Sequence, residues 1–298
     1  MKVLVLGGGG MLGHKMFQQL AARFPDTYCT LRGTRSEAGF NGVIPADLGT
    51  VLERIDAGHW PSLERLLSDL RPDVIVNCVG AIKQRAAAAD ALVSIALNAL
   101  LPHQLASTVA GWNGRLIHFS TDCVFSGHRG SYAEDDVSDA EDLYGRTKFL
   151  GETAAPNALT IRTSIIGREL RHHASLLDWF LSQSGLSVRG YTKALWSGVT
   201  TSHLADVVGD LVVAPTPLSG LYQLSSGCVS KFELLKLLRD AYAKRIEIVP
   251  DDDVHCDRSL NGQRFAAATG YRFPGWPALL QQLTSDPTPY PDVATIAS

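Results

Sequence analysis

Tyr144 and Lys148 form the pair of side chains whose types and spacing most directly indicate catalysis. They lie four positions apart in "LYGRTKFLGE", so on a helix both side chains point the same way. A tyrosine has a pKa of about 10 and is a poor proton donor at neutral pH unless a neighbouring cation stabilises its phenolate. Lys148 would supply that cation and could also bind a nicotinamide ribose. Because such pairs also occur on exposed helices, the two residues need a supporting context.

The supporting context is the stretch "RLIHFSTDCVF", in which a buried strand predicted over residues 115–120 ends at hydroxyl-bearing residues. Ligands of parallel sheets bind beyond the carboxyl ends of the strands. Ser120 and Thr121 lie at such an end, and a hydroxyl opposite Tyr144 would bind a substrate carbonyl. An acid and an oxyanion partner of this kind suit hydride transfer to a ketone.

The opening residues "MKVLVLGGGGMLGHK" read as a strand, a glycine turn and a helix. Gly8, Gly10 and Gly13 match the spacing G-x-G-x-x-G, whereas counting from Gly7 through the same two later glycines gives G-x-x-G-x-x-G. In either case the helix N-terminus offers N–H groups and a partial positive charge to a pyrophosphate. A tight turn without a ligand is the alternative, but the order of strand, turn and helix favours a dinucleotide site.

The end of the second predicted strand, over residues 27–33, bears on the choice of nucleotide. It continues as "TLRGTR", with Arg32 and Arg35 and no acidic residue before Glu37. An acidic residue there would bind the ribose hydroxyls, whereas arginine accommodates a 2′-phosphate. NADPH is therefore predicted over NADH, which remains possible, since two arginines in a surface loop can also be merely solvated.

The elements that must position these residues alternate between strand and helix up to residue 167. This order predicts an α/β fold: a Rossmann-type doubly wound parallel sheet, because parallel strands need crossover connections. Beyond residue 167 the pattern loosens into a smaller mixed C-terminal portion. We therefore predict an NAD(P)-binding domain over residues 1–167, rejoined by part of 200–228, and a mostly substrate-binding portion over residues 168–298.

Individual elements are predicted from hydrophobic periodicity. Strands are expected at residues 2–7, 27–33, 73–80, 115–120, 158–167, 220–225 and 245–249. Helices are expected at residues 11–24, 61–70, 86–110 with a bend at Pro102, from Tyr144 onward, and at 174–184, 203–213 and 231–244. The tail from Thr284, with three prolines and little periodicity, is expected to be loose.

Composition limits the classes of function. The chain has 298 residues and a net charge of −3, which argues against nucleic acid or an anionic membrane as partner. Its five cysteines form no C-x-x-C, and no H-E-x-x-H is present, so neither a disulfide framework nor a metal site is expected. The N-terminus does not read as a signal peptide, and no stretch reaches the length needed to span a bilayer. The expected location is the cytoplasm.

Several motifs in order resemble one family. They are "GGGGMLG", "NCVG", "LNALLPHQLA", "LIHFSTDCVFSG", "YGRTKFLGE", "IRTSIIG" and "WSGVTT". With these, the sequence resembles an extended short-chain dehydrogenase/reductase, and within that group the dTDP-4-dehydrorhamnose reductase branch. The resemblance covers most of the first 210 residues, thins afterwards, and selects the spacing that starts at Gly7.

The resemblance implies roles for particular residues. Thr121, Tyr144 and Lys148 would be the catalytic set, Asp56 would contact the adenine, and Ala57 would also bind the cofactor. The remaining cofactor contacts would come from the glycine turn, the end of the "NCVG" strand, one buried helix residue and the "IRTSIIG" segment. These are Gly7, Gly10, Met11, Leu12, Gly13, Cys78, Val79, Gly80, Asn98 and Ile165, beside Arg32 and Arg35.

The substrate implied by the resemblance is a nucleotide-activated 4-keto-6-deoxy sugar, whose C4 ketone would be reduced for polysaccharide precursor synthesis. Its expected contacts are Lys83, Thr121, Asp122, Cys123, Trp196 and Arg258, the last as a diphosphate ligand. Lys83 and Arg258 could equally be solvated. Related 4,6-dehydratases have glutamate at the position of Cys123, so dehydration is disfavoured. Rhamnose-type reductases usually have tyrosine there, which leaves the exact sugar open.

Two alternatives remain. A sugar-nucleotide epimerase with tightly held NAD would use the same glycine turn and the same Tyr–Lys pair. A non-catalytic NADP-binding regulatory subunit, such as the beta subunit of methionine adenosyltransferase, would not need the catalytic set that this chain retains. A homodimer is possible, although no residue pattern here indicates one.

Overall fold

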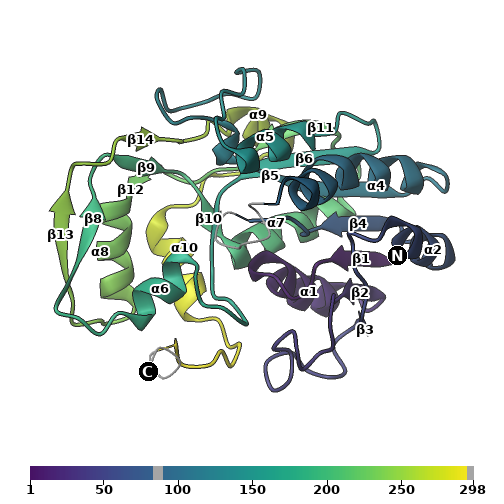
Figure 1. The fold of residues 1–298 in the computed structure, drawn as a ribbon, viewed down its shortest axis with the longest axis horizontal. Helices are drawn as coiled ribbons and strands as arrows, with labels where there is room; N and C mark the ends of the chain where they lie inside the picture. The colour runs from purple at the N-terminus through teal and green to yellow at the C-terminus, as the bar shows by residue number, and fades with distance from the viewer. Residues whose placement is uncertain (83–89, 294–298) are drawn as a thin grey trace.

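Seven parallel strands form the main sheet of the computed structural model, which describes residues 1–82 and 90–293. Their order across the sheet is β11-β6-β5-β4-β1-β2-β3 (Figure 1). The strands are β1 (Val3–Leu6), β2 (Thr27–Thr30), β3 (Thr50–Leu52), β4 (Val74–Asn77), β5 (Arg115–Thr121), β6 (Ala158–Thr163) and β11 (Gly220–Gln223). The predicted Rossmann-type fold is confirmed.

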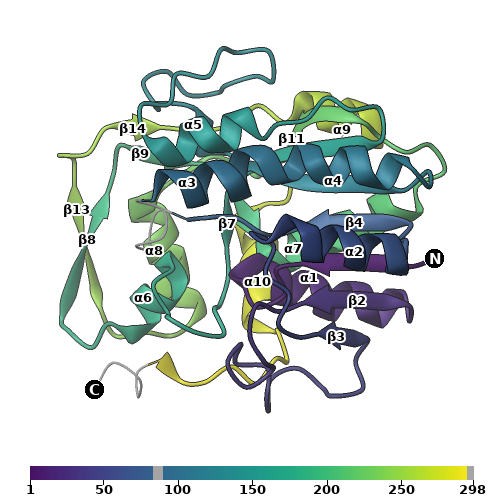
Figure 2. The same cartoon turned by 45° about the vertical axis from the view of Figure 1, so that its right-hand side comes forward.

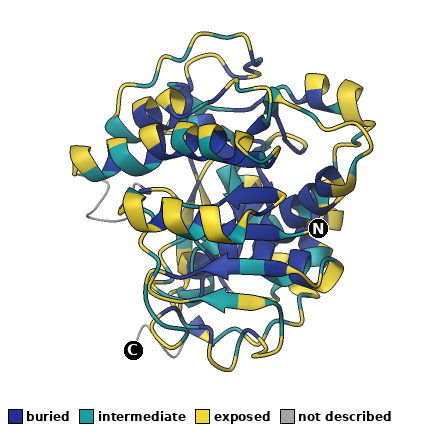
Figure 3. Ribbon diagram, turned by 90° about the vertical axis from the view of Figure 1, so that its right-hand side faces the viewer, coloured by how far each residue is buried: buried dark blue, intermediate teal, exposed yellow. Residues whose placement is uncertain are grey.

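Helices cover both faces of this sheet because successive strand residues point to opposite sides. Val3 and Val5 of β1 pack in one core with α1 (Met11–Arg23) and α7 (Thr201–Val213). Leu4 and Leu6 pack in another core with α2 (Trp60–Leu70) and α4 (Leu101–Ala110) (Figure 2). The central strands are therefore buried on both sides, as their uniform dark colour in Figure 3 shows.

The chain reverses its direction of travel across the sheet between β1 and β4. From β1 the sheet extends to β2 and β3 on one side, and from β4 to β5 and β6 on the other. Ligands of such sheets bind at this reversal, beyond the carboxyl ends of the strands. The glycine turn follows β1 and the "NCVG" segment follows β4, so both lie at this edge.

A smaller mixed portion lies to the left in Figure 1. In it β8 (Ser187–Tyr191) pairs with β13 (Glu247–Asp251), and β9 (Ala194–Trp196) lies between β12 (Val229–Ser230) and β14 (Cys256–Asp257). Helices α6 (Leu176–Ser182), α8 (Lys231–Ala241) and α10 (Trp276–Thr284) supply most of its core. The helix α9 (Gln263–Thr269) instead packs its Phe265 into the main core, beside β11. The predicted domain limits remain a prediction.

Within the described residues, the helix predicted over residues 86–110 begins at Ala91, because Asp90 is extended. Asp90 caps α3 (Ala91–Ser94) by accepting from the backbone N–H groups of Leu92 and Val93, and residues 83–89 lie outside the described part. A π-helical turn, η2 (Ile95–Leu100), joins α3 to α4. There the Leu101 N–H donates to the Ala96 carbonyl, five residues back. Since Pro102 has no N–H to bond the carbonyl four residues back, the wider turn accommodates it without breaking the helix.

The run Ala91–Ala110 is long and apolar enough to cross a membrane, by length and composition alone; elsewhere in the described residues no other helix meets that test. The expectation that no stretch reaches this length is therefore wrong. Leu101, Leu105 and Val109 nevertheless pack against the sheet, as in the core helix of an α/β fold.

Two other expectations are corrected. The strand predicted over residues 158–167 divides into β6 and β7 (Ile165–Ile166), and β7 leaves the main sheet to pair with β10 (Val199–Thr200). Over its described residues the tail beyond Thr284 is not loose: Lys15 Nζ of α1 lies 2.7 Å from Asp286 Oδ2, and Val293 is buried. Residues 294–298 of the predicted tail lie outside the described part. Residues 286–292 form neither helix nor strand, which explains their lack of periodicity, yet their side chains contact a helix far away in sequence.

Candidate active site

A cavity of about 410 Å³ opens at the carboxyl edge of the main sheet. It is lined by the first turn of α1, the segments after β4, β5 and β6, and the inner face of α5 (Leu143–Leu150). Twelve residues predicted from the sequence line it: Gly10, Met11, Leu12, Cys78, Val79, Gly80, Thr121, Asp122, Cys123, Tyr144, Lys148 and Ile165.

The glycine turn forms one end of this cavity. Gly7 has a φ of +82°, in the left-handed region that favours glycine. A Cβ at Gly13 would lie 2.1 Å from the Gly7 carbonyl oxygen, so only glycine allows the helix to start this close to the strand. Gly7 and Gly13 therefore shape the turn, whereas Gly10, Met11 and Leu12 reach the cavity.

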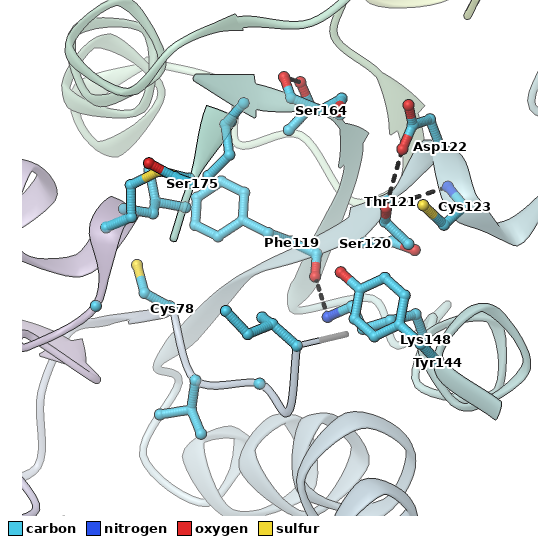
Figure 4. A pocket seen from close by; sticks show the side chains of 18 of the residues that line it. Cys78, Phe119, Ser120, Thr121, Asp122, Cys123, Tyr144, Lys148, Ser164 and Ser175 are labelled. Atoms are coloured by element: carbon cyan, nitrogen blue, oxygen red, sulfur yellow. Dashed lines mark hydrogen bonds between the residues drawn. The ribbon is translucent and has the colours of Figure 1, made fainter. Parts of the chain in front are cut away.

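Thr121 ends β5 at the other side of the cavity. Its side-chain oxygen accepts the Cys123 N–H (3.1 Å) and its hydroxyl donates to Asp122 Oδ1 (3.1 Å), which starts the 3-10 turn η3 (Asp122–Val124) (Figure 4). This local bonding holds the Thr121 side chain at the cavity wall. The neighbouring Ser120 donates to Glu152 Oε1 (2.7 Å), which pairs with Arg162.

Tyr144 and Lys148 lie on the face of α5 that is turned toward Thr121, as their four-residue spacing predicts (Figure 4). Lys148 is buried, and its Nζ donates to the Phe119 carbonyl (2.6 Å). Burial lowers the pKa of Lys148 to about 8, and the nearby Glu152 carboxylate acts in the opposite direction. The side chain therefore still carries its charge at neutral pH.

The phenol of Tyr144 departs from the sequence-based expectation. Its pKa is raised, chiefly because burial disfavours the phenolate, and a hydrogen bond with Thr121 acts in the opposite direction. The expected lowering of this pKa by Lys148 is therefore wrong for this structure, in which the lysine ammonium bonds the Phe119 carbonyl. Tyr144 is a phenol at neutral pH and holds a proton that it can donate.

Asn98 connects α5 to the opposite wall and does not line the cavity itself. It is buried in η2, where its side chain bonds both backbone groups of Ala81 (2.9 and 3.1 Å) and donates to Thr147 Oγ1 (3.2 Å). Thr147 belongs to α5, the helix that carries Tyr144 and Lys148. The amide thus ties the backbone after Gly80 to α5 and keeps the cavity open between them.

Trp196 and Arg258 lie behind the substrate side of the wall. The Trp196 indole N–H donates to Ser164 Oγ (2.6 Å), and Ser164 lines the cavity. Arg258 Nε donates to the Phe125 carbonyl (2.8 Å), and its Nη1 lies 3.7 Å from Cys123 Sγ. Each of the two thus contacts the wall of the cavity, and neither lines it.

The predicted adenosine contacts lie outside the main cavity. Arg35 donates to the carbonyls of Ile44 and Pro45 (2.9 and 3.3 Å), so its guanidinium holds a neighbouring loop. Arg32 is exposed on the same side, just beyond β2. Asp56 is exposed and accepts the Gly58 N–H (2.9 Å), whereas Ala57 packs against the core under β1. Lys83, a predicted substrate contact, lies outside the described residues.

One part of the wall was not predicted. Glu169, His172, Ala174 and Ser175 line the cavity from the segment after β7. The Glu169 carboxylate caps this segment by accepting the N–H groups of Ala174 and Ser175 (2.6 and 2.9 Å). The only signal in the sequence was the adjacent histidine pair at 172 and 173, which has no recognisable motif.

Comparison with known proteins agrees with the motifs. Residues 1–251 match the family model described as the RmlD substrate binding domain. The chain is 28% identical over 222 residues to a probable dTDP-4,6-dihydroxy-2-methyloxan-3-one 4-ketoreductase of Streptomyces antibioticus, covering 72% of this chain and 63% of that protein. It is 30% identical over 169 residues to a dTDP-4-dehydrorhamnose reductase of Burkholderia thailandensis, covering 55% and 50%. The matched regions thus span less than two thirds of these two relatives.

A relative of a different kind is matched over more of its length. The methionine adenosyltransferase 2 subunit beta of Xenopus tropicalis is 28% identical over 310 residues, covering 94% of this chain and 89% of the subunit. The resemblance found from the motifs is therefore confirmed for the family, which includes both reductases and such subunits.

Solved structures share the fold. A dTDP-4-dehydrorhamnose reductase of Clostridium acetobutylicum superimposes with a TM-score of 0.77 at 18% identity, over 95% of this chain and 98% of that one. The enzyme of the same name from Bacillus anthracis, in complex with NADP, gives 0.74 at 18% over 95% and 98%. The Bordetella bronchiseptica enzyme WbmG, in complex with NAD, gives 0.77 at 18% over 95% and 92%. At these identities the likeness concerns the fold alone.

Proposed function

The chain belongs to the RmlD substrate binding domain family, and from this premise we propose that it reduces the C4 ketone of a nucleotide-activated 4-keto-6-deoxy sugar with NADPH. One observation carries the proposal. Thr121, Tyr144 and Lys148 lie in the same cavity as the glycine turn at the start of α1. A hydroxyl, a phenol and an ammonium are thereby brought into one cavity beside a turn that suits a dinucleotide.

The residues around the turn fit a nicotinamide dinucleotide. Gly10 is the N-cap of α1 and forms no side-chain cap, so the first N–H groups of the helix can bind a pyrophosphate. Gly10, Met11 and Leu12 line the cavity at this point. Tyr144, Lys148 and Ile165 at its other end would surround the nicotinamide.

When bound, the nicotinamide supplies a hydride to the carbonyl carbon of the substrate. Tyr144 donates its phenolic proton to the ketone oxygen, and its raised pKa keeps that proton in place until then. The Thr121 hydroxyl, which donates to Asp122 Oδ1 in this structure, would turn to donate to the same oxygen and orient it. Lys148 would stabilise the phenolate that remains and bind the nicotinamide ribose once its ammonium turns from the Phe119 carbonyl, to which it donates in this structure.

We propose NADPH over NADH on account of Arg32, which is exposed beyond β2 and has the charge that a 2′-phosphate requires. Arg35 contributes indirectly, because it holds the loop at Ile44 and Pro45. Fold relatives are known in complex with NADP and with NAD, so both nucleotides belong in the test.

The test is an assay of NADPH oxidation by the purified protein against a panel of nucleotide-linked 4-keto sugars. Stoichiometric oxidation with at least one of them supports the proposal. An epimerase would instead purify with bound NAD and convert substrate without added cofactor, and this result would replace reduction with epimerisation.

A second candidate is a non-catalytic subunit, favoured by the 94% coverage of this chain in the match to the methionine adenosyltransferase 2 subunit beta. Under this alternative the protein binds NADPH but oxidises none with any sugar of the panel. The complete Thr121, Tyr144 and Lys148 set favours the reductase.

A further inference from the structure

The C-terminal residues 286–293 lie against α1, the helix that begins at the glycine turn. We propose that this segment, the C-terminal strap, is a positioning element for the cofactor: through Tyr290 and His14 it fixes the Gly10 carbonyl and so sets the affinity for NADPH. The proposal rests on the proposed function, because it assumes that the glycine turn binds a nicotinamide dinucleotide.

The strap is attached to α1 by several polar contacts. Lys15 Nζ lies 2.7 Å from Asp286 Oδ2, in a pair whose side chains are only 4% and 10% exposed. Lys15 Nζ also donates to Thr288 Oγ1 (2.8 Å), and so does Gln18 Nε2 (3.2 Å). A buried ion pair with added hydrogen bonds holds its partners in one geometry. Tyr290 is therefore delivered to a defined place beside His14.

The protonation of the His14 ring determines which group donates in its two side-chain hydrogen bonds, to the Gly10 carbonyl and to Tyr290. Its Nδ1 lies 2.9 Å from the Gly10 carbonyl oxygen, which can only accept, so Nδ1 carries the proton. Burial lowers the pKa of His14 to about 4, and a neutral imidazole has one N–H, which leaves Nε2 as an acceptor. The Tyr290 hydroxyl, 2.8 Å from Nε2, must then donate to it.

This chain of bonds ends at the cofactor site. The Gly10 carbonyl accepts from His14 twice, from Nδ1 and from the backbone N–H (3.1 Å). Because the peptide group is planar and trans, a fixed Gly10 carbonyl also fixes the Met11 N–H, which points the opposite way, out of the helix N-terminus. Gly10 and Met11 line the cavity where a pyrophosphate would bind.

The strap also reaches the opposite wall. Arg168 Nη2 donates to the Pro291 carbonyl (2.7 Å), its guanidinium lies 5.0 Å from the centre of the Tyr290 ring, and its Nε donates to Asp178 Oδ1 (2.5 Å). The other Asp178 oxygen accepts the Glu169 N–H (2.9 Å), at the start of the wall formed by residues 169–175. The strap thus joins the two walls at the cofactor end, away from the ketone-reducing end at Tyr144.

The test replaces Tyr290 with phenylalanine, which keeps the ring and removes only the hydroxyl. NADPH binding is measured by fluorescence titration, and kcat at saturating NADPH is measured separately. Loss of one hydrogen bond predicts a Kd for NADPH raised about three- to tenfold, with kcat changed less than about twofold. Asp286→Asn, which weakens the other attachment, should raise the Kd in the same direction.

The matched control is Tyr271→Phe. The Tyr271 hydroxyl lies 2.8 Å from Nε2 of His203 in the same kind of pair, and neither residue lines the cavity. This control should lose comparable thermal stability but bind NADPH as the wild type does. The proposal is overturned if Tyr290→Phe binds NADPH like the wild type, or if Tyr271→Phe weakens binding equally.

The same titration separates this proposal from the proposed function. A wild-type protein that binds NADPH but reduces no keto sugar contradicts the proposed reaction, while the rise in Kd for Tyr290→Phe still supports the strap. A wild-type protein that binds neither NADPH nor NADH overturns both.

Discussion

Burial of Lys148 disfavours the positive charge that the proposed reaction requires of this side chain. Its ammonium is needed beside Tyr144, yet burial disfavours the charge and lowers the pKa from 10.5 to about 8. Lys148 Nζ donates a hydrogen bond to the Phe119 carbonyl (2.6 Å), which offsets part of the cost of burying the charge. A residue kept for chemistry therefore reduces the stability of the fold that holds it.

Lys148→Met should abolish reduction and raise the melting temperature at pH 7. In the wild type the pKa of Lys148 is 10.5 in the unfolded state and about 8 in the folded state. Between pH 8 and pH 10.5 the unfolded state therefore binds more protons than the folded state. The free energy of unfolding of the wild type rises with pH across this window. Methionine does not titrate, so the variant lacks this pH dependence. Below pH 8 its free energy of unfolding should exceed that of the wild type by about 1–3 kcal/mol, and this difference should vanish above pH 10.5. Thermal unfolding from pH 6 to 11 measures this, and a variant less stable than wild type at pH 7 would contradict it.

Arg32→Ala should raise the KM for NADPH about ten- to hundredfold, because a charge-assisted bond to the 2′-phosphate is lost. The KM for NADH should stay near the wild-type value. Steady-state kinetics with both nucleotides measure the difference, with Arg65→Ala on the exposed side of α2 as the control. Equal changes for the two nucleotides would remove the case for NADPH.

At the scale of elements, the closeness of α5 to the end of β5 decides whether Tyr144 reaches the cavity. A Cβ at Gly145 would lie 2.2 Å from the Cys123 carbonyl oxygen, and that backbone cannot easily move. The glycine next to Tyr144 thus permits a close approach of α5 to β5 that a side chain at this position would prevent.

Gly145→Ala should destabilise the protein by about 1–3 kcal/mol and strongly reduce kcat, since α5 must shift away from Thr121. Gly209→Ala in α7 is the matched control. Its Cβ would meet Arg23 Nη1 at 2.3 Å, the end of a flexible and partly exposed side chain. Chemical denaturation and kinetics of both variants decide the point, and a stable, active Gly145→Ala would show that the close approach is dispensable.

Elements with a strong local pattern could be predicted from the sequence. Strands β1 and β4 are short, largely apolar runs, and α1 and α8 begin at the expected residues. The three-residue edge strand β3 was missed because it has too few residues for a pattern. The separation of β7 from β6 was missed because the apolar run continues through both, although pairing with β10 moves β7 out of the sheet.

At the scale of the whole molecule, part of the candidate site could be predicted from the sequence and part could not. Motif residues at or just beyond strand ends, such as Thr121 and Gly80, were predicted because the sheet brings the carboxyl ends of its parallel strands to one edge. The wall at Glu169 and Ser175 and the contact of Tyr290 with His14 were not predicted. They depend on tertiary packing between segments that carry no recognisable motif. Arg35 was predicted as a phosphate ligand, yet its partners are backbone carbonyls of its own loop.

The measurement that tests the central claim most directly is kcat of Tyr144→Phe, with the NADPH affinity of the same variant measured alongside. The account predicts that kcat falls about 10²- to 10⁴-fold because the proton donor is lost. NADPH should bind within about threefold of the wild-type affinity, since the pyrophosphate end of the cavity is unchanged. A variant that reduces the keto sugar at the wild-type rate would contradict the account.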